Sequence, residues 1–581
     1  MKHKLTIEVL SNVRCRVKGA PKDVLKFLDE SLAETQKGAE WSPMHRRFGG
    51  RWDGKKHHFH ISPTFEGIGT FPKGLTHRVQ TLLATKQLKA KLVDLRKHVL
   101  PEAKLSRLKP DMLVGVKMEG RYAYQLEAVR QALAAQCGIL FMATNAGKSE
   151  IATAMISVLR ERTILFVVPN KNLLKQTRET IAERLGTIVE NIGVIGGGKF
   201  QPKEITVAII NSVTPAKKAK SGRAKHRNDI LRAFLKTIDV VFLDEGHHAK
   251  AATWFRLMGA LVNAQFRYLM SGTPFGGGND LMVEAATGPV IYEIRNDDLI
   301  KLGVSAKPTV RLIEIAKPQL GIMLEEPDPD SYDDGPGNES WNAVYEAGVV
   351  NNIYRNDIIA RTAAAYVKQG KSVIILVRRL AQGSNIRAAL AKLKVPVEFA
   401  HGAMPEPTKD KHVAWFKGKP GRVLVGSTIF DEGMNMPNIN ALIVGDGGQS
   451  LRKVLQQVGR SIRRKKTGAN VVDVVDFADV THHWLAKHSL ERFDIYKGEG
   501  FDVIEENPQK KEAADENGRG RAEQSGTQAV PALQREADSG HQLHGHAGHE
   551  ALRNARRATS EGADHVPEDG DVLRWHWRQA A

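Results

Sequence analysis

At 581 residues the chain is too long for one hydrophobic core, and three or four folded units are expected. The formal net charge of +20 favours a polyanionic partner such as nucleic acid, although a solvated cationic surface gives the same count. Only Cys15 and Cys137 are present, which excludes a disulfide framework and a cysteine-rich metal site. The start "MKHKLTIEVL" lacks a signal-peptide core, and no apolar run approaches the roughly 20 residues that span a bilayer, so a cytoplasmic protein without membrane contact is expected.

The first half of the chain divides into two regions. Residues 1–100 mix short alternating segments, such as "KLTIEVL", with the basic stretch "MHRRFGGRWDGKKHHFHI", and they predict a small α+β accessory domain that binds nucleic acid. Residues 115–305 alternate apolar runs ("GILFMAT", "TILFVVP", "VVFLDEG") with helical stretches. Such continuous apolar runs are typical of buried parallel strands, which predicts an α/β domain.

The second half of the chain repeats this alternation of apolar runs and helical stretches, and the alternation ends near residue 504. Residues 306–344, with the acidic "EEPDPDSYDDGPGNES", predict a linker. Residues 345–504, with "SVIILVR", "GRVLVGS" and "NVVDVVDFA", predict a second α/β domain. Residues 505–581 hold too few apolar residues to offset chain entropy, which predicts a disordered tail. The tail offers two candidate elements: a histidine cluster with zinc-like spacing, for which disorder is the favoured interpretation, and a small partner-docking element. They comprise His541, His544, His546, His549, Trp575 and Trp577.

The segment "MATNAGKSEIATA", residues 142–154, has the order of a phosphate-binding loop: a strand, a turn, Gly147-Lys148-Ser149 and a helix. Backbone N–H groups and the helix N-terminus cradle phosphate oxygens in such loops. Lys148 is expected to reach the β- and γ-phosphates of ATP, and the Ser149 hydroxyl is expected to hold Mg²⁺. Met142 replaces the usual first glycine, and Asn145 and Ala146 replace the more usual Gly and Ser. Because Asn tolerates left-handed backbone angles better than most residues, the turn can still form. The predicted loop contacts are Thr144, Asn145, Ala146, Gly147, Lys148 and Ser149.

A second motif, "VVFLDEGHH", delivers two acids at the end of an apolar strand. Asp244 is expected to bind Mg²⁺, and Glu245 to orient and deprotonate the attacking water. The alternative is a surface acidic pair that follows a strand. The presence of both motifs, in order, within one α/β domain argues against that alternative.

These motifs resemble those of the superfamily 2 DExH-type helicases, and the resemblance extends through both α/β domains. Asp244-Glu245-Gly246-His247 resembles the DExH box, "MSGTP" resembles the coupling motif, and "VVPNKNLLKQ" and "IINSVTP" resemble motifs that touch the nucleic-acid backbone. In the second domain, "VLVGSTIFDEGMNMP" is similar to motif V and "QQVGRSIRR" to motif VI. The resemblance implies two tandem RecA-like P-loop domains with parallel sheets.

The resemblance also implies roles for individual residues. Arg460 and Arg463 would be arginine fingers that stabilise charge on the γ-phosphate when the cleft closes, tying hydrolysis to domain motion. Tyr124 and Gln125 would recognise adenine, although a plain helix-start glutamine is an alternative for Gln125. Two departures leave coupling strength open: Asn435 replaces a common Asp, and Asn211 a frequent Gln. Further ATP contacts are implied for Gly433 and Asn435, and coupling roles for His247, Ser271, Thr273 and Gln456.

Candidate nucleic-acid contacts come from the front domain and from the helicase-like motifs. They are Arg46, Arg47, Arg51, Lys55, Lys171, Lys175, Asn211, Ser212 and Ser427. The basic run "PAKKAKSGRAKHRN" is either a solvated loop or a contact to a second strand. All such contacts are expected to be independent of base sequence and sensitive to salt.

The stretches "FGGRWDGKKHHFHI" and "GTFPKGL" narrow the resemblance to the phage UvsW-type DNA helicases. This implies an ATP-dependent DNA helicase that unwinds or branch-migrates junctions, stalled forks and R-loops in recombination and replication repair, acting in the host cytoplasm if phage-encoded. An RNA helicase and a translocating subunit of a restriction-type complex remain alternatives. A passive binding protein is disfavoured because Lys148, Asp244, Glu245, Arg460 and Arg463 have no shared purpose without ATP hydrolysis.

Overall fold

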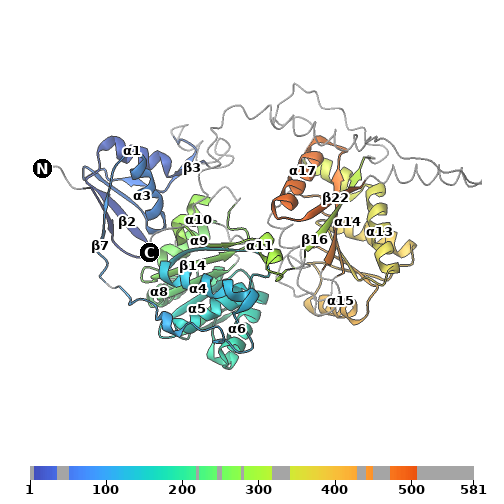
Figure 1. Cartoon of the computed structure of the whole chain (residues 1–581), viewed down its shortest axis with the longest axis horizontal. Helices are drawn as coiled ribbons and strands as arrows, with labels where there is room; N and C mark the ends of the chain where they lie inside the picture. The colour runs from blue at the N-terminus through green and yellow to red at the C-terminus, as the bar shows by residue number, and fades with distance from the viewer. Residues whose placement is uncertain are drawn as a thin grey trace, which may run out of the picture. The chain divides into compact units, whose positions relative to one another are not determined.

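The computed structural model describes ten stretches of the chain: 5–35, 52–97, 99–216, 222–244, 251–275, 280–305, 307–316, 341–427, 440–448 and 471–506. The chain forms two compact units, Met1–Ser305 and Ala306–Ala581 (Figure 1). Within the described stretches no helix is both long and apolar enough to cross a membrane.

The first unit begins with a small domain in which two helices accompany a five-stranded sheet of order β5-β6-β2-β1-β7. Strand β2 alternates buried and exposed residues, and the buried residues of α1 (Val24, Leu25, Leu28) share one helix face. The α+β character predicted for residues 1–100 is therefore present. The elements are β1 Thr6–Val9, β2 Arg14–Lys18, α1 Lys22–Ser31, β3 Ala33–Thr35, β4 Lys55–His57, β5 His60–Ile61, β6 Ile68–Pro72, η2 Lys73–Leu75, α3 Thr76–Thr85 and β7 Lys91–Asp94.

This front domain packs directly on the domain that follows. Its buried core includes Leu281 and Ala285 of helix α10, Asp280–Thr287. Gly74 of η2 lies so close to α10 that a Cβ there would be 2.2 Å from the carbonyl oxygen of Glu284. Glycine is therefore required at this contact.

The rest of the first unit is an α/β domain around an eight-stranded sheet of order β11-β10-β12-β9-β13-β14-β8-β15. All neighbouring strands are parallel except β10 and β11. The strands are β8 Cys137–Met142, β9 Ile164–Val168, β10 Gly193–Gly196, β11 Lys199–Gln201, β12 Ile205–Ile209, β13 Val240–Asp244, β14 Phe266–Ser271 and β15 Val290–Ile294. The helices are α4 Ala123–Ala135, α5 Lys148–Val158, α6 Lys171–Leu185, α7 Ile210–Val213, α8 Gly222–Lys236, α9 Ala251–Ala260, α10 and α11 Asn296–Lys301.

Helices cover both faces of this sheet, which explains its continuous apolar runs. Helices α4, α5 and α6 pack on the face that includes Leu140 and Met142, whereas α8 and α9 pack on the face that includes Ile139 (Figure 1). Every residue of β9 is buried. The predicted parallel α/β domain is confirmed.

The second unit is also α/β, with a parallel seven-stranded sheet of order β18-β19-β17-β20-β21-β16-β22. The strands are β16 Lys307–Ile315, β17 Val373–Leu376, β18 Val397–Ala400, β19 Val423–Gly426, β20 Ala441–Val444, β21 Val471–Asp479 and β22 Asp502–Glu506. The helices are α12 Trp341–Tyr345, which continues as the π-helix η7 Glu346–Val350, then α13 Ile353–Lys368, α14 Leu380–Lys392, α15 Glu406–Gly418 and α17 His483–Gly498.

Two predicted boundaries of the second unit are wrong. The linker expected at 306–344 contains β16, which pairs with β21 along its whole length, and the first residues of the tail expected from 505 belong to β22. One ion pair explains both errors: Arg311 of β16 donates to the Glu506 carboxylate at 2.7 and 2.9 Å. These strands look polar in sequence because their charges neutralise each other across the sheet. Residues 507–581, with the tail histidines and tryptophans, lie outside the described residues.

Candidate functional site

Three parallel strands of the first sheet end side by side at one edge. Strand β14 lies between β13 and β8, with Asp244 paired to Met270 and Ser271 paired to Phe141. Because the strands are parallel, the segments that follow Met142, Asp244 and Ser271 all leave from the carboxyl edge. This is where open α/β sheets bind their ligands.

The loop after β8 has the geometry of a phosphate cradle. Asn145 has φ +74° and Gly147 has φ +81°, so left-handed residues alternate with ordinary ones in the turn. Gly147 precedes α5 and provides no side-chain cap to the first helical turn. Backbone N–H groups at such a helix start can therefore donate to phosphate oxygens. The left-handed conformation at Asn145 agrees with the tolerance expected of an Asn there.

Two side chains of α4 support this loop from behind. The Tyr124 hydroxyl donates to the carbonyl oxygen of Ala146 at 2.9 Å, and Gln125 Nε2 donates to the same oxygen at 3.3 Å. Burial raises the pKa of Tyr124, which keeps its hydroxyl a donor. A Cβ on Gly147 would lie 2.2 Å from Gln125 Nε2. Sequence alone assigned these two residues to adenine and missed their contact with the loop.

The segment after β14 packs against the start of the same loop. A Cβ on Gly272 would lie 3.1 Å from the Met142 carbonyl oxygen and 3.8 Å from the Thr144 nitrogen. Ser271 and Thr273 are buried, and the Thr273 N–H donates to the Ser271 hydroxyl at 3.1 Å. The predicted coupling residues Ser271 and Thr273 thus flank Gly272, which lies against the start of the predicted phosphate loop.

The predicted nucleic-acid contacts of the first helicase domain follow neighbouring strands at this same edge. Lys171 and Lys175 are exposed in the first turns of α6, whose N-terminus is capped by Asn170 accepting from the Leu173 N–H. Asn211 is exposed and Ser212 half-buried in α7, directly after β12. They extend the carboxyl edge beyond the loop, because β12 and β9 are parallel neighbours.

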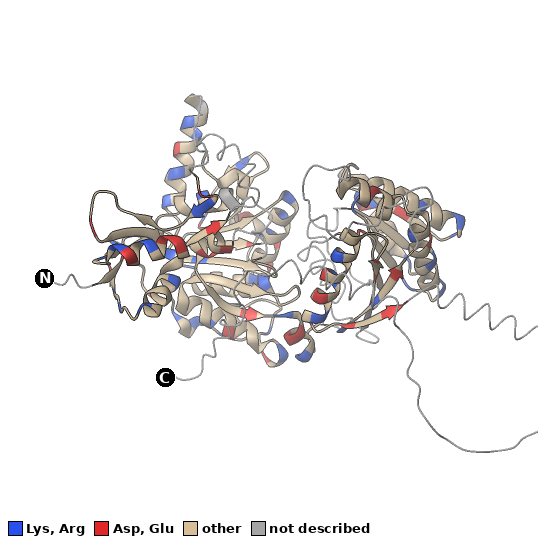
Figure 2. Cartoon of the chain, turned by 90° about the horizontal axis from the view of Figure 1, so that it is seen from above, with Lys and Arg blue, Asp and Glu red and all other residues tan. Residues whose placement is uncertain are grey.

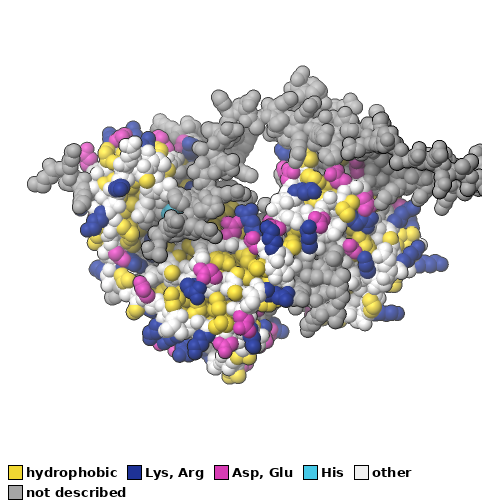
Figure 3. Space-filling model, viewed as in Figure 1, with side chains coloured by type: hydrophobic (Ala, Val, Ile, Leu, Met, Phe, Trp, Pro, Cys, Tyr) yellow, Lys and Arg dark blue, Asp and Glu magenta, His cyan; other side chains and the backbone are white. Residues whose placement is uncertain are grey.

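Other predicted contacts are more scattered. Lys55 is exposed in β4 of the front domain, and Ser427 is only 5% exposed after β19. Basic and acidic residues are mixed along the ribbons of both units (Figure 2). The face in Figure 3 likewise shows Lys and Arg side chains lying among Asp and Glu. The predicted residues that lie outside the described residues are Arg46, Arg47, Arg51, Glu245, His247, Gly433, Asn435, Gln456, Arg460 and Arg463.

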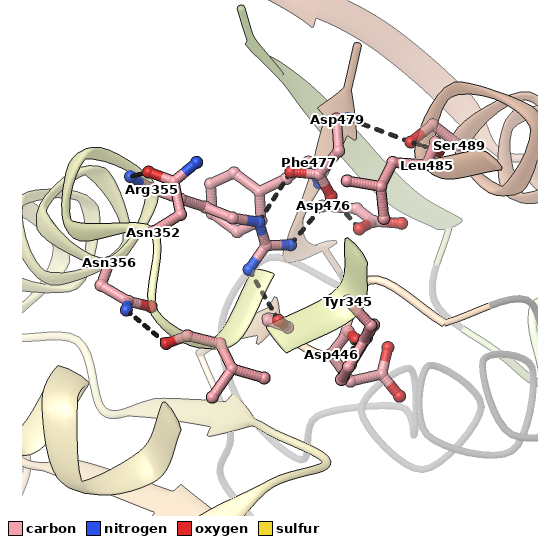
Figure 4. Close-up of polar contacts among 12 residues, drawn as sticks. Tyr345, Asn352, Arg355, Asn356, Asp446, Asp476, Phe477, Asp479, Leu485 and Ser489 are labelled. Carbon is pink, nitrogen blue, oxygen red and sulfur yellow. Dashed lines mark hydrogen bonds and ion pairs between the residues drawn. The ribbon is translucent and has the colours of Figure 1, made fainter. Parts of the chain in front are cut away.

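The second unit contains two fully buried ion pairs that sequence analysis missed, and Figure 4 shows the one between Arg355 and Asp479. Arg355 of α13 donates from Nε to Asp479 at 2.7 Å, and Arg492 of α17 donates from Nε to Asp476 at 2.8 Å. All four side chains are at most 1% exposed. Burial alone would lower the pKa of Arg492, but the nearby Asp476 and Asp479 carboxylates raise it overall.

These pairs hold the backbone that leaves β20. Arg355 Nη1 donates to the Gly445 carbonyl at 2.7 Å, and Arg492 Nη1 donates to the Gly448 carbonyl at 3.1 Å. Tyr345 donates its hydroxyl proton to the carbonyl between them, that of Asp446, at 2.5 Å (Figure 4). The segment that resembles motif VI, residues 456–464, begins eight residues after Gly448 in the sequence. Acids at buried positions of an apolar strand, as in "DVVDFAD", were the available signal.

Comparison with known proteins matches two family models. Residues 118–276 match the res subunit of type III restriction enzymes, and residues 356–465 match the helicase conserved C-terminal domain. The DNA 3'-5' translocase XPB2 of Sulfurisphaera tokodaii is 24% identical over 427 residues, 68% of this chain and 91% of its own. The ATP-dependent RNA helicase DBP8 of Meyerozyma guilliermondii is 22% identical over 405 residues, 68% of this chain and 86% of its own.

The ATP-dependent DNA helicase uvsW of Enterobacteria phage T4 is 22% identical over 405 residues, 66% of this chain and 76% of its own. The crystal structure of T4 UvsW has 18% identity and a TM-score of 0.40, covering 87% of this chain and 99% of that one. Each half of a helicase core is therefore matched within its own α/β unit. The chain thus carries the two domains of a superfamily 2 helicase, in tandem RecA-like α/β units, and is an ATP-dependent helicase.

Proposed function

We propose that the protein is a DNA helicase or translocase that uses ATP to unwind or branch-migrate branched DNA in recombination and replication repair. The observation that carries the proposal is the meeting of the Gly147 loop, Asp244 and Ser271 at one sheet edge. Among the relatives, XPB2 is named a DNA translocase and uvsW a DNA helicase, which favours DNA. The RNA helicase DBP8 supports RNA as the second candidate substrate.

We assign the roles at the ATP site as follows. Lys148, the first residue of α5, neutralises the β- and γ-phosphates, and Glu245 orients and deprotonates the attacking water. The Ser149 hydroxyl and the Asp244 carboxylate are oxygen ligands that would hold Mg²⁺, and the ion would neutralise negative charge on the phosphates. Arg460 and Arg463 of the second domain stabilise charge on the γ-phosphate.

The test compares ATP turnover without nucleic acid and with single-stranded DNA, a four-way junction lacking free single strands, or RNA. Turnover should rise most with branched or single-stranded DNA, and the junction should be converted to separate duplexes only with ATP. Stimulation by RNA alone would transfer the assignment to an RNA helicase. Stimulation by DNA without strand separation or branch movement would indicate a translocase subunit.

The Gly147→Ala variant should lose ATP affinity by at least about tenfold. The substitution strains a left-handed residue and places a Cβ 2.2 Å from Gln125 Nε2, so the loop and the Gln125 side chain that supports it must rearrange. Fluorescent-nucleotide titration without nucleic acid measures the effect. Gly370→Ala is the matched control, because Gly370 has φ +74° and a Cβ added there would meet no heavy atom within 4 Å. Equal affinities in both variants would contradict the assigned loop.

Replacing Lys171 and Lys175 together with glutamine should weaken DNA binding without changing ATP binding. Each exposed lysine that contacts a backbone phosphate contributes about one unit to the slope of log Kd against log salt concentration. The slope should therefore fall by about two in fluorescence anisotropy titrations. Lys301→Gln, at an exposed position at the end of α11, should leave this slope unchanged. An unaltered slope in the double variant would remove α6 from the DNA-binding surface.

A further inference from the structure

A cavity of about 230 Å³ lies between the front domain and the first helicase domain. Its wall comes from β2, β6 and η2 on one side and from α9, α10 and the first residues of β8 and β14 on the other. Cys137 and Arg267 line it, and they lie at the amino ends of strands whose carboxyl ends carry the ATP site. The two sites are thus separated by roughly 16 Å of strand.

The polar wall of the cavity is cationic. Its polar and charged lining residues include Asn12, Arg14, His60, Thr70, Lys73 and Arg267, and no Asp or Glu lines it. Cations buried without carboxylates are unusual, because desolvation penalises an uncompensated charge. Which groups neutralise or solvate each positive charge therefore determines which ligand the cavity can bind.

Arg267 is satisfied by backbone. Its guanidinium donates to the carbonyl oxygens of Leu261 at 2.9 Å, Met258 at 2.8 Å and Ala286 at 3.2 Å, near the ends of α9 and α10. These helix ends carry partial negative charge and accommodate the cation. Arg267 therefore provides a fixed positive field at the cavity floor rather than a mobile ligand.

Lys73 and Arg14 have no such protein acceptors, and only the half-buried Lys73 is poorly solvated, because Arg14 is exposed. Within the described parts of the chain, neither the Lys73 ammonium nor the Arg14 guanidinium makes a hydrogen bond or ion pair. Burial lowers the pKa of Lys73, and the positive Arg96 and Arg267 lower it further. The ammonium group is thus held in a site that disfavours its charge unless an anion is present.

We propose that this cavity binds a phosphate group, with Lys73 and Arg14 as its direct ligands and the Thr70 hydroxyl beside them. Phosphate oxygens accept several charge-assisted hydrogen bonds at once, which suits the ammonium, guanidinium and hydroxyl groups of residues that line one cavity. The volume lies below the roughly 300–1,000 Å³ of pockets for drug-sized ligands, so it fits one phosphate group with its waters rather than a whole nucleotide. The phosphate comes either from a nucleic-acid backbone or from a free phosphate ion. The inference is independent of the ATP site.

Isothermal titration of the full chain with inorganic phosphate, at ionic strength matched with sodium chloride, tests the cavity. Lys73→Gln and Arg14→Gln should each weaken binding by about tenfold, the effect of losing one charge-assisted hydrogen bond. Lys89→Gln, an exposed lysine of the same domain, should bind like the parent, and Lys148→Ala should also retain this binding. Because Arg14 is exposed, its substitution leaves the fold intact even if Lys73→Gln is destabilising.

Duplex DNA titrations with the same variants identify the source of the phosphate. If it belongs to a nucleic-acid backbone, Lys73→Gln and Arg14→Gln will weaken DNA binding relative to Lys89→Gln, and inorganic phosphate will compete. If it is free phosphate, DNA affinity will match that of Lys89→Gln while phosphate binding is lost. Phosphate and DNA binding unchanged in both cavity variants would overturn the proposal, whatever the outcome of the ATPase assays.

Discussion

Lys148→Ala should reduce nucleic-acid-stimulated ATP turnover by at least about a hundredfold. The reason is that Lys148 begins α5 directly after the left-handed Gly147. From this position its ammonium group can stabilise the negative charge that develops on the transferred phosphoryl group. Steady-state phosphate release with saturating single-stranded DNA measures the loss. Circular dichroism of the variant checks that the fold is retained.

The companion variant Glu245→Gln separates binding from chemistry. It keeps the shape of the side chain and removes the general base, so ATP affinity should be preserved while turnover falls. Lys148→Ala should lower both. A Lys148→Ala protein that hydrolyses ATP at the parental rate would show that the loop after β8 is not the phosphate site.

Arg355→Met should destabilise the second unit by about 3–5 kcal/mol, because it leaves the Asp479 carboxylate buried without its partner. Hydrogen exchange of β21 in the full chain, with β9 of the first unit as the internal reference, measures this locally. Slower turnover is a second expected effect, since the Gly445 carbonyl, eleven residues before the segment that resembles motif VI, loses a donor.

Arg361→Met in the same helix is the matched control. Arg361 pairs with Asp357, but both side chains are well exposed, so the loss should stay within about 1 kcal/mol. Replacing both Arg355 and Asp479 with apolar residues should recover much of the stability lost in the single variant. Equal exchange rates in the Arg355 and Arg361 variants would show that the buried pair contributes no more than a surface pair.

Much of the fold could be predicted because buried parallel strands leave a local signature. Strands such as β9 and β13 are short apolar runs between helices, and their order along the chain already indicates an α/β domain. The loop at Gly147 and the acid at Asp244 were equally visible, since their chemistry requires particular residues at particular points. The strands, the loop and the acid are each recognised from residues that are adjacent in the sequence.

The features that sequence analysis missed depend on neighbours in space. Strands β16 and β22 look polar because Arg311 and Glu506 pair only after the sheet has formed. Tyr124 and Gln125 support the Ala146 carbonyl only because α4 packs beside α5. The buried Arg355 cannot be told from a surface arginine until the position of Asp479 is known.

The hydrophobic core that the front domain shares with α10 limits which N-terminal truncations of this helicase can be made. A fragment that starts after residue 100 would expose Leu281 and Ala285 of α10 to water. The surface of α10 on which η2 packs would be exposed as well. Because this apolar surface would be exposed, the fragment should aggregate, and its ATPase activity could not be measured reliably. A truncated version of this helicase should therefore either retain the first 100 residues or carry polar substitutions on the exposed side of α10.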